Sequence, residues 1–365
     1  RFSGVPVEIQ NYIDDTGVQV ADVVVGLREL EGKHLDAIRH LADSTTRFDF
    51  YCWDLYARVT DWYEADHERL KIRAKTLHDI ERGDGEAAAA ARFIADRIVR
   101  RHLETMARMK VDYDLLAWEG DILRLQFWAR AFEILKEQGA VALQTQGLLA
   151  GCWVMKIDEQ VGEATADTEE AETAAREGED TRRGSHDGDA GEEEAEGREK
   201  VIVRSNGTVT YVGKDIAYQF WKFGLLGRDF HYRVFERWPD GRTLWATTSE
   251  PTRGEGAHPP FGRAASVYNV IDVRQSYLQK LLKQALLAIG HPEQAARSVH
   301  FSYEMVALSH ATARQLGYDI PASEAARPFV EVSGRKGLGV KADDLLDALV
   351  QKAEAEVVKR NPDLP

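Results

Sequence analysis

The feature that most constrains the fold of this chain is an acidic segment near its middle, residues 158–200. It contains no Leu, Ile, Met, Phe, Tyr or Trp, and Glu, Ala, Gly, Asp, Thr and Arg make up nearly all of it. Burial of so few apolar groups cannot offset the conformational entropy that the chain would lose on ordering. We therefore expect the segment to be disordered. We interpret it as a surface-loop insertion, with an acidic partner-binding role as the alternative. The folded core must come from the residues on either side.

The same segment accounts for most of the net charge. It holds 17 acids and 5 bases, a net −12 out of the −14 of all 365 residues, and the remainder is close to neutral at −2. The overall acidity therefore does not exclude an RNA partner, because local patches decide nucleic-acid binding.

Membrane and redox signals are weak. No run reaches the roughly 18 apolar residues of a membrane span, and no secretory pattern is visible. The two cysteines, Cys52 and Cys152, have aromatic or apolar neighbours. This pattern is typical of buried thiols in a reduced, cytoplasmic protein, and no membrane partner is expected.

Polar residues follow the first predicted strand. Residues 5–13 alternate like a strand, and a short polar stretch separates them from a helix predicted over 18–27. Ligands of α/β sheets gather at the carboxyl ends of strands. An Asx turn with a helix cap is the alternative reading. The candidate ligand-binding residues here are Asn11, Asp14, Asp15 and Gln19.

From about residue 35 to 138 the apolar spacing is helical, which predicts core-facing stripes. Asp84-Gly85 separates two long helices, and residues 115–135 predict a further amphipathic helix. Glu119 stands out as an acid in a predicted loop between apolar segments. It is either a surface carboxylate or one directed into a cavity.

A hairpin is predicted at 201–211, because Asn206-Gly207 suits a two-residue turn in which both residues take positive φ. A helix then runs from Lys214 to Phe223. Tyr211 and Asp215 therefore lie at a strand-to-helix junction, four positions apart, where they can converge on one point. A helix cap is the alternative role for Asp215.

Further elements follow in an α/β order. Residues 230–245 predict a second hairpin, 267–272 a short buried strand, and 277–289 a helix. Arg274 and Gln275 come directly after that strand, again at the edge where α/β sheets hold ligands.

Near the C-terminus a strand at 329–333 enters a loop that is rich in glycine and positive charge. The cations are Arg335, Lys336 and Lys341, and a helix at 343–360 follows. Mobile backbone and positive charge favour a phosphate-binding loop over a core segment. The helix is predicted to bury its apolar positions, Leu345, Leu346, Leu349, Val350, Ala353 and Val357.

Several motifs are absent. There is no GxxxxGK[ST] phosphate loop, no G-x-S-x-G nucleophile elbow, and no pair of histidines three or four residues apart, so no protein-held metal is predicted. The G-x-G-x-x-A at 337–342 lacks a complete βαβ unit, which disfavours a dinucleotide site.

Five blocks together resemble the arginyl-tRNA synthetase family, which is a class I aminoacyl-tRNA synthetase family. The third block is the most specific, and the order of all five matches the family. The blocks are Asn11–Gln19, Tyr113–Glu119, Arg204–Tyr218, Asp272–Gln275 and Val332–Gly337 with the following Asp343–Leu346.

The resemblance implies an α/β fold with a Rossmann-like parallel-sheet catalytic domain. Residues 1–34 would be its first part, 35–157 a helical connective insertion with some catalytic-domain contacts, and 158–200 the acidic insertion; 201–365 would be its second part. No H-x-G-H motif occurs, although the family has one before the strand with which this chain begins. The tRNA-contacting and anticodon-binding domains have no counterpart either. We interpret the chain as most of a catalytic domain without its first strand and helix, and we expect this fragment alone to be inactive.

The resemblance also assigns roles. It implies that Glu119, Tyr211, Asp215 and Gln275 bind the substrate arginine. A guanidinium is a planar fork of donors that carboxylates hold well, so the two acids suit this ligand. Ser333, Gly334, Arg335 and Lys336 would form the ATP-binding loop, with Ser333, Arg335 and Lys336 catalytic. Gly334 stands where the family signature has its central lysine, so a neighbouring cation must replace it.

The implied activity is arginine–tRNA ligation in the cytoplasm, with L-arginine, ATP, Mg²⁺ and tRNA(Arg) as partners and no DNA. Another class I aminoacyl-tRNA synthetase is the first alternative. A non-catalytic synthetase-like fragment or interaction module is the second.

Overall fold

The computed structural model describes residues 3–156, 199–205, 209–238, 240–304, 307–317, 320, 328–331 and 341–362. The chain divides into two compact units. The first comprises Arg1–Gly17, Leu70–Ala88 and Tyr113–Glu304, and the second comprises Val18–Arg69, Ala89–Asp112 and Met305–Pro365.

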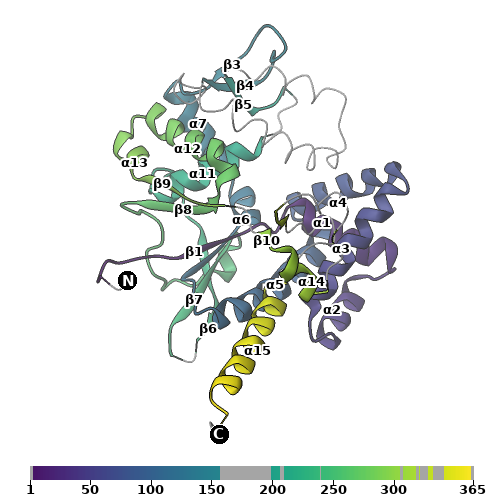
Figure 1. The fold of residues 1–365 in the computed structure, drawn as a ribbon. Helices are drawn as coiled ribbons and strands as arrows, with labels where there is room; N and C mark the ends of the chain where they lie inside the picture. Colours follow the sequence, from purple (N-terminus) through teal and green to yellow (C-terminus); the bar gives the residue numbers. More distant parts are fainter. Residues whose placement is uncertain are drawn as a thin grey trace. The chain divides into compact units, whose positions relative to one another are not determined.

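A four-stranded sheet organises the first unit (Figure 1). Its order is β1 (Gln10–Ile13), β2 (Leu115–Trp118), β7 (Thr243–Thr248) and β6 (His231–Arg237). The first three strands are parallel and β6 is antiparallel to β7. All four residues of β2 are buried, as expected for a parallel strand covered on both faces. The α/β architecture predicted from the sequence is therefore confirmed.

The strand β2 corrects the prediction of one helix over 115–135. Leu115 to Trp118 is a strand, α6 (Glu119–Arg124) starts immediately after it, and α7 (Phe127–Glu137) follows. Periodicity could not separate these elements, because a short run of consecutive buried apolar residues suits a buried strand as well as a helix. Glu119 is consequently the first residue of a helix and does not lie in a loop.

Two smaller sheets complete the first unit. The parallel pair joins β8 (Val267–Asp272) to β9 (Ser298–Tyr303), and the antiparallel sheet joins β3 (Ala142–Leu143), β4 (Trp153–Lys156) and β5 (Glu199–Val203). The position of β5 corrects the expected extent of the acidic segment, whose last two residues, Glu199 and Lys200, are in this strand. Residues 157–198 lie outside the described part.

The predicted hairpin at 201–211 is only partly present. Val203 and Val209 form an isolated antiparallel bridge, and Asn206-Gly207 lies outside the described residues. Tyr211 does not end a strand but begins the helix α11 (Tyr211–Lys222). The second predicted hairpin is confirmed as β6 and β7. The predicted strand 267–272 matches β8 in its bounds, but the expectation that it is buried was wrong, since Tyr268 and Val270 are exposed.

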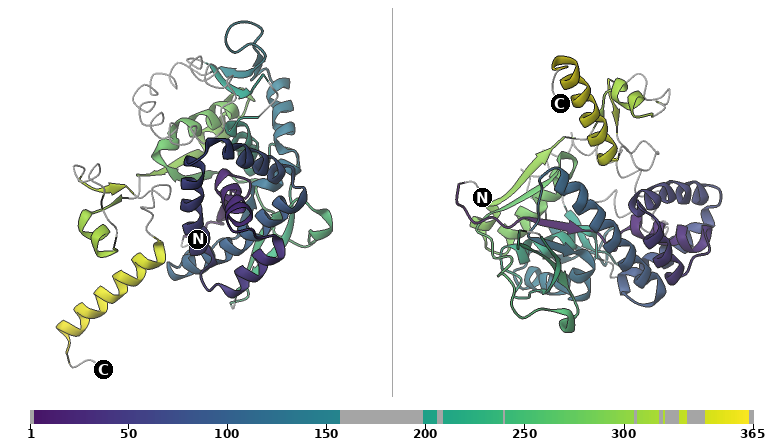
Figure 2. Two further views of the ribbon diagram at one scale, coloured as in Figure 1. Left: turned by 90° about the vertical axis from the view of Figure 1, so that its right-hand side faces the viewer. Right: turned by 90° about the horizontal axis from the view of Figure 1, so that it is seen from below.

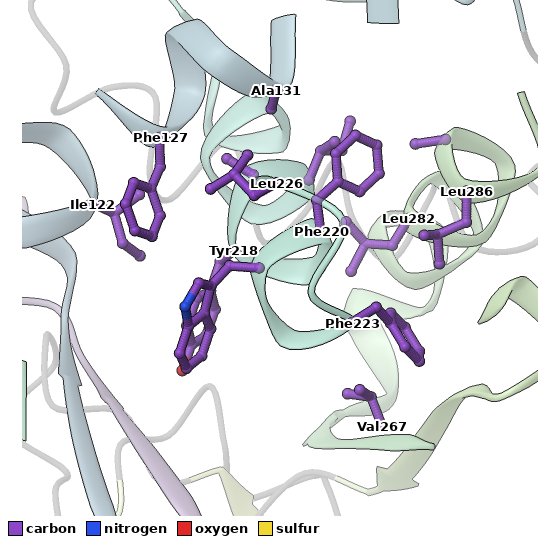
Figure 3. Packing of buried hydrophobic residues seen from close by; sticks show 14 of the residues in the cluster. Ile122, Phe127, Ala131, Tyr218, Phe220, Phe223, Leu226, Val267, Leu282 and Leu286 are labelled. Carbon is purple, nitrogen blue, oxygen red and sulfur yellow. The ribbon is translucent and has the colours of Figure 1, made fainter. Parts of the chain in front are cut away.

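Helix α11 is central to the core of the first unit. Its buried residues Ile216 and Phe220 belong to one apolar cluster with Phe127 of α7 and Leu282 of α12 (Ser276–Ala288). Figure 3 shows Phe127, Phe220 and Leu282 among the apolar side chains of this cluster. Helices α4 (Leu70–Arg82) and α13 (Pro292–Ala296) also belong to this unit. The polar residues on the rest of α11 are thereby held in place.

The second unit is mainly helical. The prediction that Asp84-Gly85 separates two helices is confirmed, since α4 ends at Arg82 and α5 starts at Gly85. Cys52 of α3 is a buried cysteine, as is Cys152 in the first unit. The elements are α1 (Val18–Val25) with a π-helical turn (Gly26–Leu30), α2 (Leu35–Ser44), α3 (Phe48–Glu64), α5 (Gly85–Arg108) from Ala89 onward, β10 (Ala307–Leu308), α14 (His310–Gln315), β11 (Val330–Glu331) and α15 (Ala342–Arg360).

Helix α15, drawn in yellow in Figure 2, is anchored at its start. Asp343 is buried and accepts hydrogen bonds from Arg47 (2.8 Å), Thr105 (2.9 Å) and Arg108 (2.5 Å). The prediction that its apolar face is buried along its length was wrong. Only the first turns are packed in the described part of the chain, with Leu345 and Leu346 half-buried. No residue in the described part of the chain packs against the apolar positions of the later turns. The apolar positions exposed there are Leu349, Val350, Ala353 and Val357.

No helix in the described ranges combines the length and apolar character that crossing a membrane requires.

We predict that Gly26→Ala destabilises the second unit. A Cβ at this position would lie 2.6 Å from Cγ2 of Val59 and 2.8 Å from Cγ of Leu55, both on α3. Overpacking of this kind costs about 1–3 kcal/mol, which outweighs the gain in helix propensity of about 1 kcal/mol. Thermal and urea unfolding measure the effect. Gly256→Ala, whose Cβ would meet nothing within 4 Å, is the matched control, and an equal effect of both changes would contradict the prediction.

Candidate functional site

The candidate site forms where β1 and β2 end. These strands are parallel and in register, with Gln10 opposite Leu115 and Ile13 opposite Trp118. Residues that follow the two strands therefore meet at one edge of the sheet. This pairing brings Glu119 next to residues that precede it by more than a hundred positions.

Glu119 is the best-coordinated acid of the site. Its Oε2 accepts a hydrogen bond from the Tyr12 hydroxyl at 2.8 Å, and its Oε1 accepts one from the Thr16 hydroxyl at 2.9 Å. The ammonium of Lys214, in the first turn of α11, lies 2.9 Å from the same Oε1. Donors from β1, from the turn after β1 and from α11 thus hold one carboxylate in a fixed position.

These partners keep Glu119 ionised. Burial alone would raise the pKa of Glu119, but the charge of Lys214 and the hydrogen bonds from Lys214, Tyr12 and Thr16 outweigh burial and lower the pKa. The pKa of Tyr12 is strongly raised by its burial and by the charge of Glu119, so Tyr12 remains a donor. The site therefore presents an anion with a fixed pattern of donors around it.

Asp14 is the second acid. Although the residue reaches the surface, its carboxyl is largely surrounded by protein, and this burial together with the charge of Glu119 raises its pKa to about 6. The backbone N–H groups of Thr16 and Gly17 donate to it. The predicted Asx turn is thus present, and it leaves the Asp14 carboxylate beside Glu119.

Asp15 and Asp121 connect the strand ends on which the site is built. Asp15 is buried, and its Oδ1 accepts from the N–H of Gly120 at 2.8 Å, while burial raises its pKa to about 6. Asp121 accepts from the hydroxyl of Thr247 at 2.8 Å and from the N–H of Ser249 at 2.8 Å. These bonds tie the ends of β1, β2 and β7 together. The candidate Asp15 therefore has a structural role.

Asp215 is the third acid. It lies on α11, and burial, followed by the charges of Glu119 and Asp14, raises its pKa to about 7 despite the opposing charges of Lys222 and Lys214. No hydrogen bond or close ion pair engages its carboxylate among the residues that the structure describes. An ionisable group so placed in a cluster of like charge is a candidate for ligand binding.

A buried polar network lies behind Asp215. The Lys222 ammonium donates to Oδ1 of Asn269 on β8 at 2.9 Å, and Nδ2 of Asn269 donates to Oε1 of Gln279 on α12 at 2.8 Å. Burial lowers the pKa of Lys222 to about 8, although the charge of Asp215 opposes this shift. Lys222 thus supplies a buried positive charge that favours ionisation of Asp215.

The structure brings only part of the predicted set together. Glu119, Asp14 and Asp215 are electrostatic neighbours. Gln275 is exposed, and no hydrogen bond within the described part of the chain joins it to them. Asn11 is half-buried within β1, and Gln19 is exposed on α1 of the other unit. The side chain of Tyr211 and the loop residues Ser333, Gly334, Arg335 and Lys336 lie outside the described residues.

Sequence reasoning missed four participants, Tyr12, Thr16, Lys214 and Lys222. Tyr12 and Asp14 alternate along β1 and its end, so the period of two could have placed them on one face. On the same helix, Lys214 comes one residue before Asp215 and Lys222 comes seven residues after it. No sequence pattern distinguishes these lysines from lysines exposed to solvent. Within the described ranges, no three His, Cys, Asp or Glu side chains are grouped so as to hold a metal ion.

The arrangement suits a cationic ligand. The charge of Glu119 raises the pKa of both Asp14 and Asp215, the charge of Asp14 also raises that of Asp215, and two ammonium groups only partly compensate these acids. A ligand with a positive, multiply donating group would relieve the repulsion and satisfy the free acceptor atoms.

No protein-family profile matches the chain. Curated arginine–tRNA ligases do match, including those of Thermococcus sibiricus (30% identical over 370 residues), Deinococcus radiodurans (31% over 367) and Thermus thermophilus (32% over 373). Each alignment covers 100% of this chain and 49% of the relative. The solved structure of Thermus thermophilus arginyl-tRNA synthetase matches with a TM-score of 0.70 at 28% identity, over 100% of this chain and 49% of that one.

The chain therefore has the fold of an aminoacyl-tRNA synthetase. Along its whole length it is homologous to arginine–tRNA ligases, and it spans about half the length of the curated relatives it matches.

We predict that Asp215→Asn stabilises the fold at pH 8. Burial raises the pKa of Asp215 from 3.8 to about 7, so the folded state binds this proton more tightly than the unfolded state does. The stability contributed by the protonated acid is then lost as the pH rises through about 7. The variant should melt at a higher temperature than the wild type at pH 8, with a smaller difference at pH 5.

Asp240→Asn is the matched control for this measurement. Hydrogen bonds from Arg242 lower the pKa of Asp240, so its removal should bring no gain at pH 8. A wild-type protein as stable as the Asp215→Asn variant at pH 8 would contradict the burial argument.

Proposed function

We propose that the protein containing this chain is an arginine–tRNA ligase, and that the described acids hold the guanidinium of L-arginine. The single observation that most supports this is Glu119, a largely buried, ionised carboxylate held by Tyr12, Thr16 and Lys214 near Asp215, whose carboxylate no described residue engages by a hydrogen bond or close ion pair. A guanidinium presents five donors in a rigid plane, which two carboxylates at an angle can engage together.

Two acids also account for selectivity. A neutral side chain would leave both carboxylates buried without a counter-charge, which is costly. A lysine ammonium is a point charge and cannot donate to both carboxylates with the geometry of a planar fork. This specificity distinguishes the proposal from another class I aminoacyl-tRNA synthetase, whose amino acid would have no use for the acids.

The remaining assignments rest on the family resemblance and the homology. Tyr211 and Gln275 complete the arginine site, and Ser333, Gly334, Arg335 and Lys336 form the ATP loop. Residues 1–34 and 201–365 make up the catalytic domain, 35–157 is a helical connective insertion, and 158–200 contains an acidic surface insertion. The protein acts in the cytoplasm.

The reaction has two steps. The arginine carboxylate attacks the α-phosphorus of ATP, and pyrophosphate leaves as arginyl-adenylate forms. A terminal ribose hydroxyl of tRNA(Arg) then attacks the arginyl carbonyl carbon and AMP leaves. No protein nucleophile is needed, because positioning and charge stabilisation suffice.

Arg335 and Lys336 would stabilise the negative charge that develops on pyrophosphate. Mg²⁺ enters the proposal as the ion bound to the phosphates of ATP. We assign no step to a metal held by the described side chains, because they contain no suitable cluster.

We predict that Asp215→Asn raises the KM for arginine in ATP–pyrophosphate exchange by about a hundredfold or more, since it leaves the guanidinium without a buried charged partner. The assay uses the full-length protein with tRNA present, and Asp240→Asn is the control. An unchanged KM for arginine would overturn the assignment. A wild-type protein without any exchange activity would favour a non-catalytic synthetase-like protein.

We further predict that arginine affinity falls as the pH is lowered. Asp215 has a pKa of about 7 and Asp14 one of about 6, and only their ionised forms attract the guanidinium. Because apparent affinity scales with the fraction of binding-competent protein, lowering the pH from 8 to 5.5 should weaken binding by about tenfold or more. Isothermal titration calorimetry measures this dependence. The Asp215→Asn variant should show a flatter profile, and an equal slope in both proteins would contradict the role of Asp215.

A further inference from the structure

Lys214 stands between two carboxylates of different exposure. Its ammonium is 2.9 Å from Oε1 of Glu119 and 3.8 Å from Oε1 of Glu81, on α4 of the same unit. The Glu119 side chain is 12% exposed, whereas that of Glu81 is 41% exposed. One ammonium thus has a buried partner in the site and a second acceptor toward solvent.

The acceptor atoms of Glu119 are already engaged. Oε2 accepts from Tyr12, and Oε1 accepts from both Thr16 and Lys214. Oε1 thus accepts two bonds and Oε2 only one, so one of the carboxylate's roughly four lone-pair positions is open, on Oε2. A guanidinium that binds bidentately needs a position on each oxygen, so it must displace Thr16 or Lys214 from Oε1. The inference that follows rests on the proposed function, since it concerns how arginine reaches this carboxylate.

Lys214 is the donor that can leave. Thr16 is 2% exposed, and the ring of Tyr12 packs against that of Tyr218 with centroids 5.3 Å apart. Their short or packed side chains have little room to move. Lys214 has a long, flexible side chain and a second carboxylate just beyond its present partner.

The balance of charge in the site also favours the departure of Lys214 from Glu119. Among the described residues, Lys214 is the only cation that contacts Glu119 in the absence of a ligand, and its charge also acts on Asp14 and Asp215. Once a guanidinium supplies a positive charge to these acids, an ammonium beside it would repel it. Moving to Glu81 removes that repulsion and keeps the ammonium paired.

We propose that Lys214 is an exchangeable counter-ion, which pairs with Glu119 in the absence of arginine and transfers to Glu81 when the guanidinium binds. Lys214 and Glu81 are then positioning residues. Lys214 holds Glu119 in its binding orientation, and Glu81 removes Lys214 from the site at the moment when its charge becomes unfavourable.

A double-mutant cycle on the full-length protein tests the exchange. L-Arginine binding is measured by isothermal titration calorimetry at pH 8 for the wild type, Glu81→Gln, Lys214→Met and the double variant. Glu81→Gln should weaken binding by at least about fivefold when Lys214 is present, because the ammonium has lost its second partner. The same substitution should have no effect when Lys214 is replaced by Met.

Two control variants separate the exchange from a general charge or folding effect. Glu81→Asp retains a carboxylate and should restore most of the affinity. Asp84→Asn removes an exposed acid just after the same helix, paired only with the exposed Arg82 in the described part, and should leave binding unchanged.

The outcomes are distinguishable. If the wild type binds arginine but Glu81→Gln weakens binding equally in both backgrounds, or in neither, the exchange is wrong while the proposed function stands. If the wild type binds no arginine, both fail. A Glu81 effect confined to the protein that retains Lys214 supports the exchange.

Discussion

The parallel pairing of β1 with β2 is the constraint on which the site depends. Tyr12 and Thr16 reach Glu119 across 107 and 103 positions of sequence, and Asp15 reaches the N–H of Gly120 across 105. All three bonds require Ile13 to lie opposite Trp118. A slip of one residue would turn Tyr12 to the other face of the sheet and remove a donor from Glu119. The buried Asp121, bonded to Thr247 and Ser249, adds β7 to the same arrangement.

The electrostatics of the site oppose stability and favour binding. Asp14 and Asp215 have raised pKa values because burial and neighbouring acids disfavour their charge. Lys214 and Lys222 offset part of this repulsion. The apolar packing of α11 against α7 and α12 offsets the remaining loss of stability. Groups whose charge the fold disfavours are common where a ligand of opposite charge binds. The arginine guanidinium of the proposed reaction is such a ligand.

Different parts of the prediction succeeded for different reasons. The bounds of the strand 267–272 were predicted correctly, but its expected burial was not, since Tyr268 and Val270 are exposed. Leu115–Trp118 was misread as helix, since its side chains are buried on both faces and show no alternation. The apolar positions of α15 were predicted to be buried from spacing alone, but spacing reports a helix face and not what packs on it. Among the candidate site residues, Glu119 and Asp215 were singled out from their positions and then assigned a role from the family resemblance, while Lys214 and Lys222 carry no sequence signal that separates them from surface lysines.

The sequence by itself determined the α/β class, the order of most elements, the acids placed at the ends of strands and helices, and the relationship to arginine–tRNA ligases. These follow from local periodicity and from residues at fixed short spacings, which a linear sequence contains directly. Only the tertiary structure decided which donors surround Glu119, that Asp15 is structural, and that Lys214 lies between Glu119 and Glu81. Those facts depend on strand register and helix packing between segments far apart in the chain, and burial together with the neighbouring charges and donors then sets the pKa of each group.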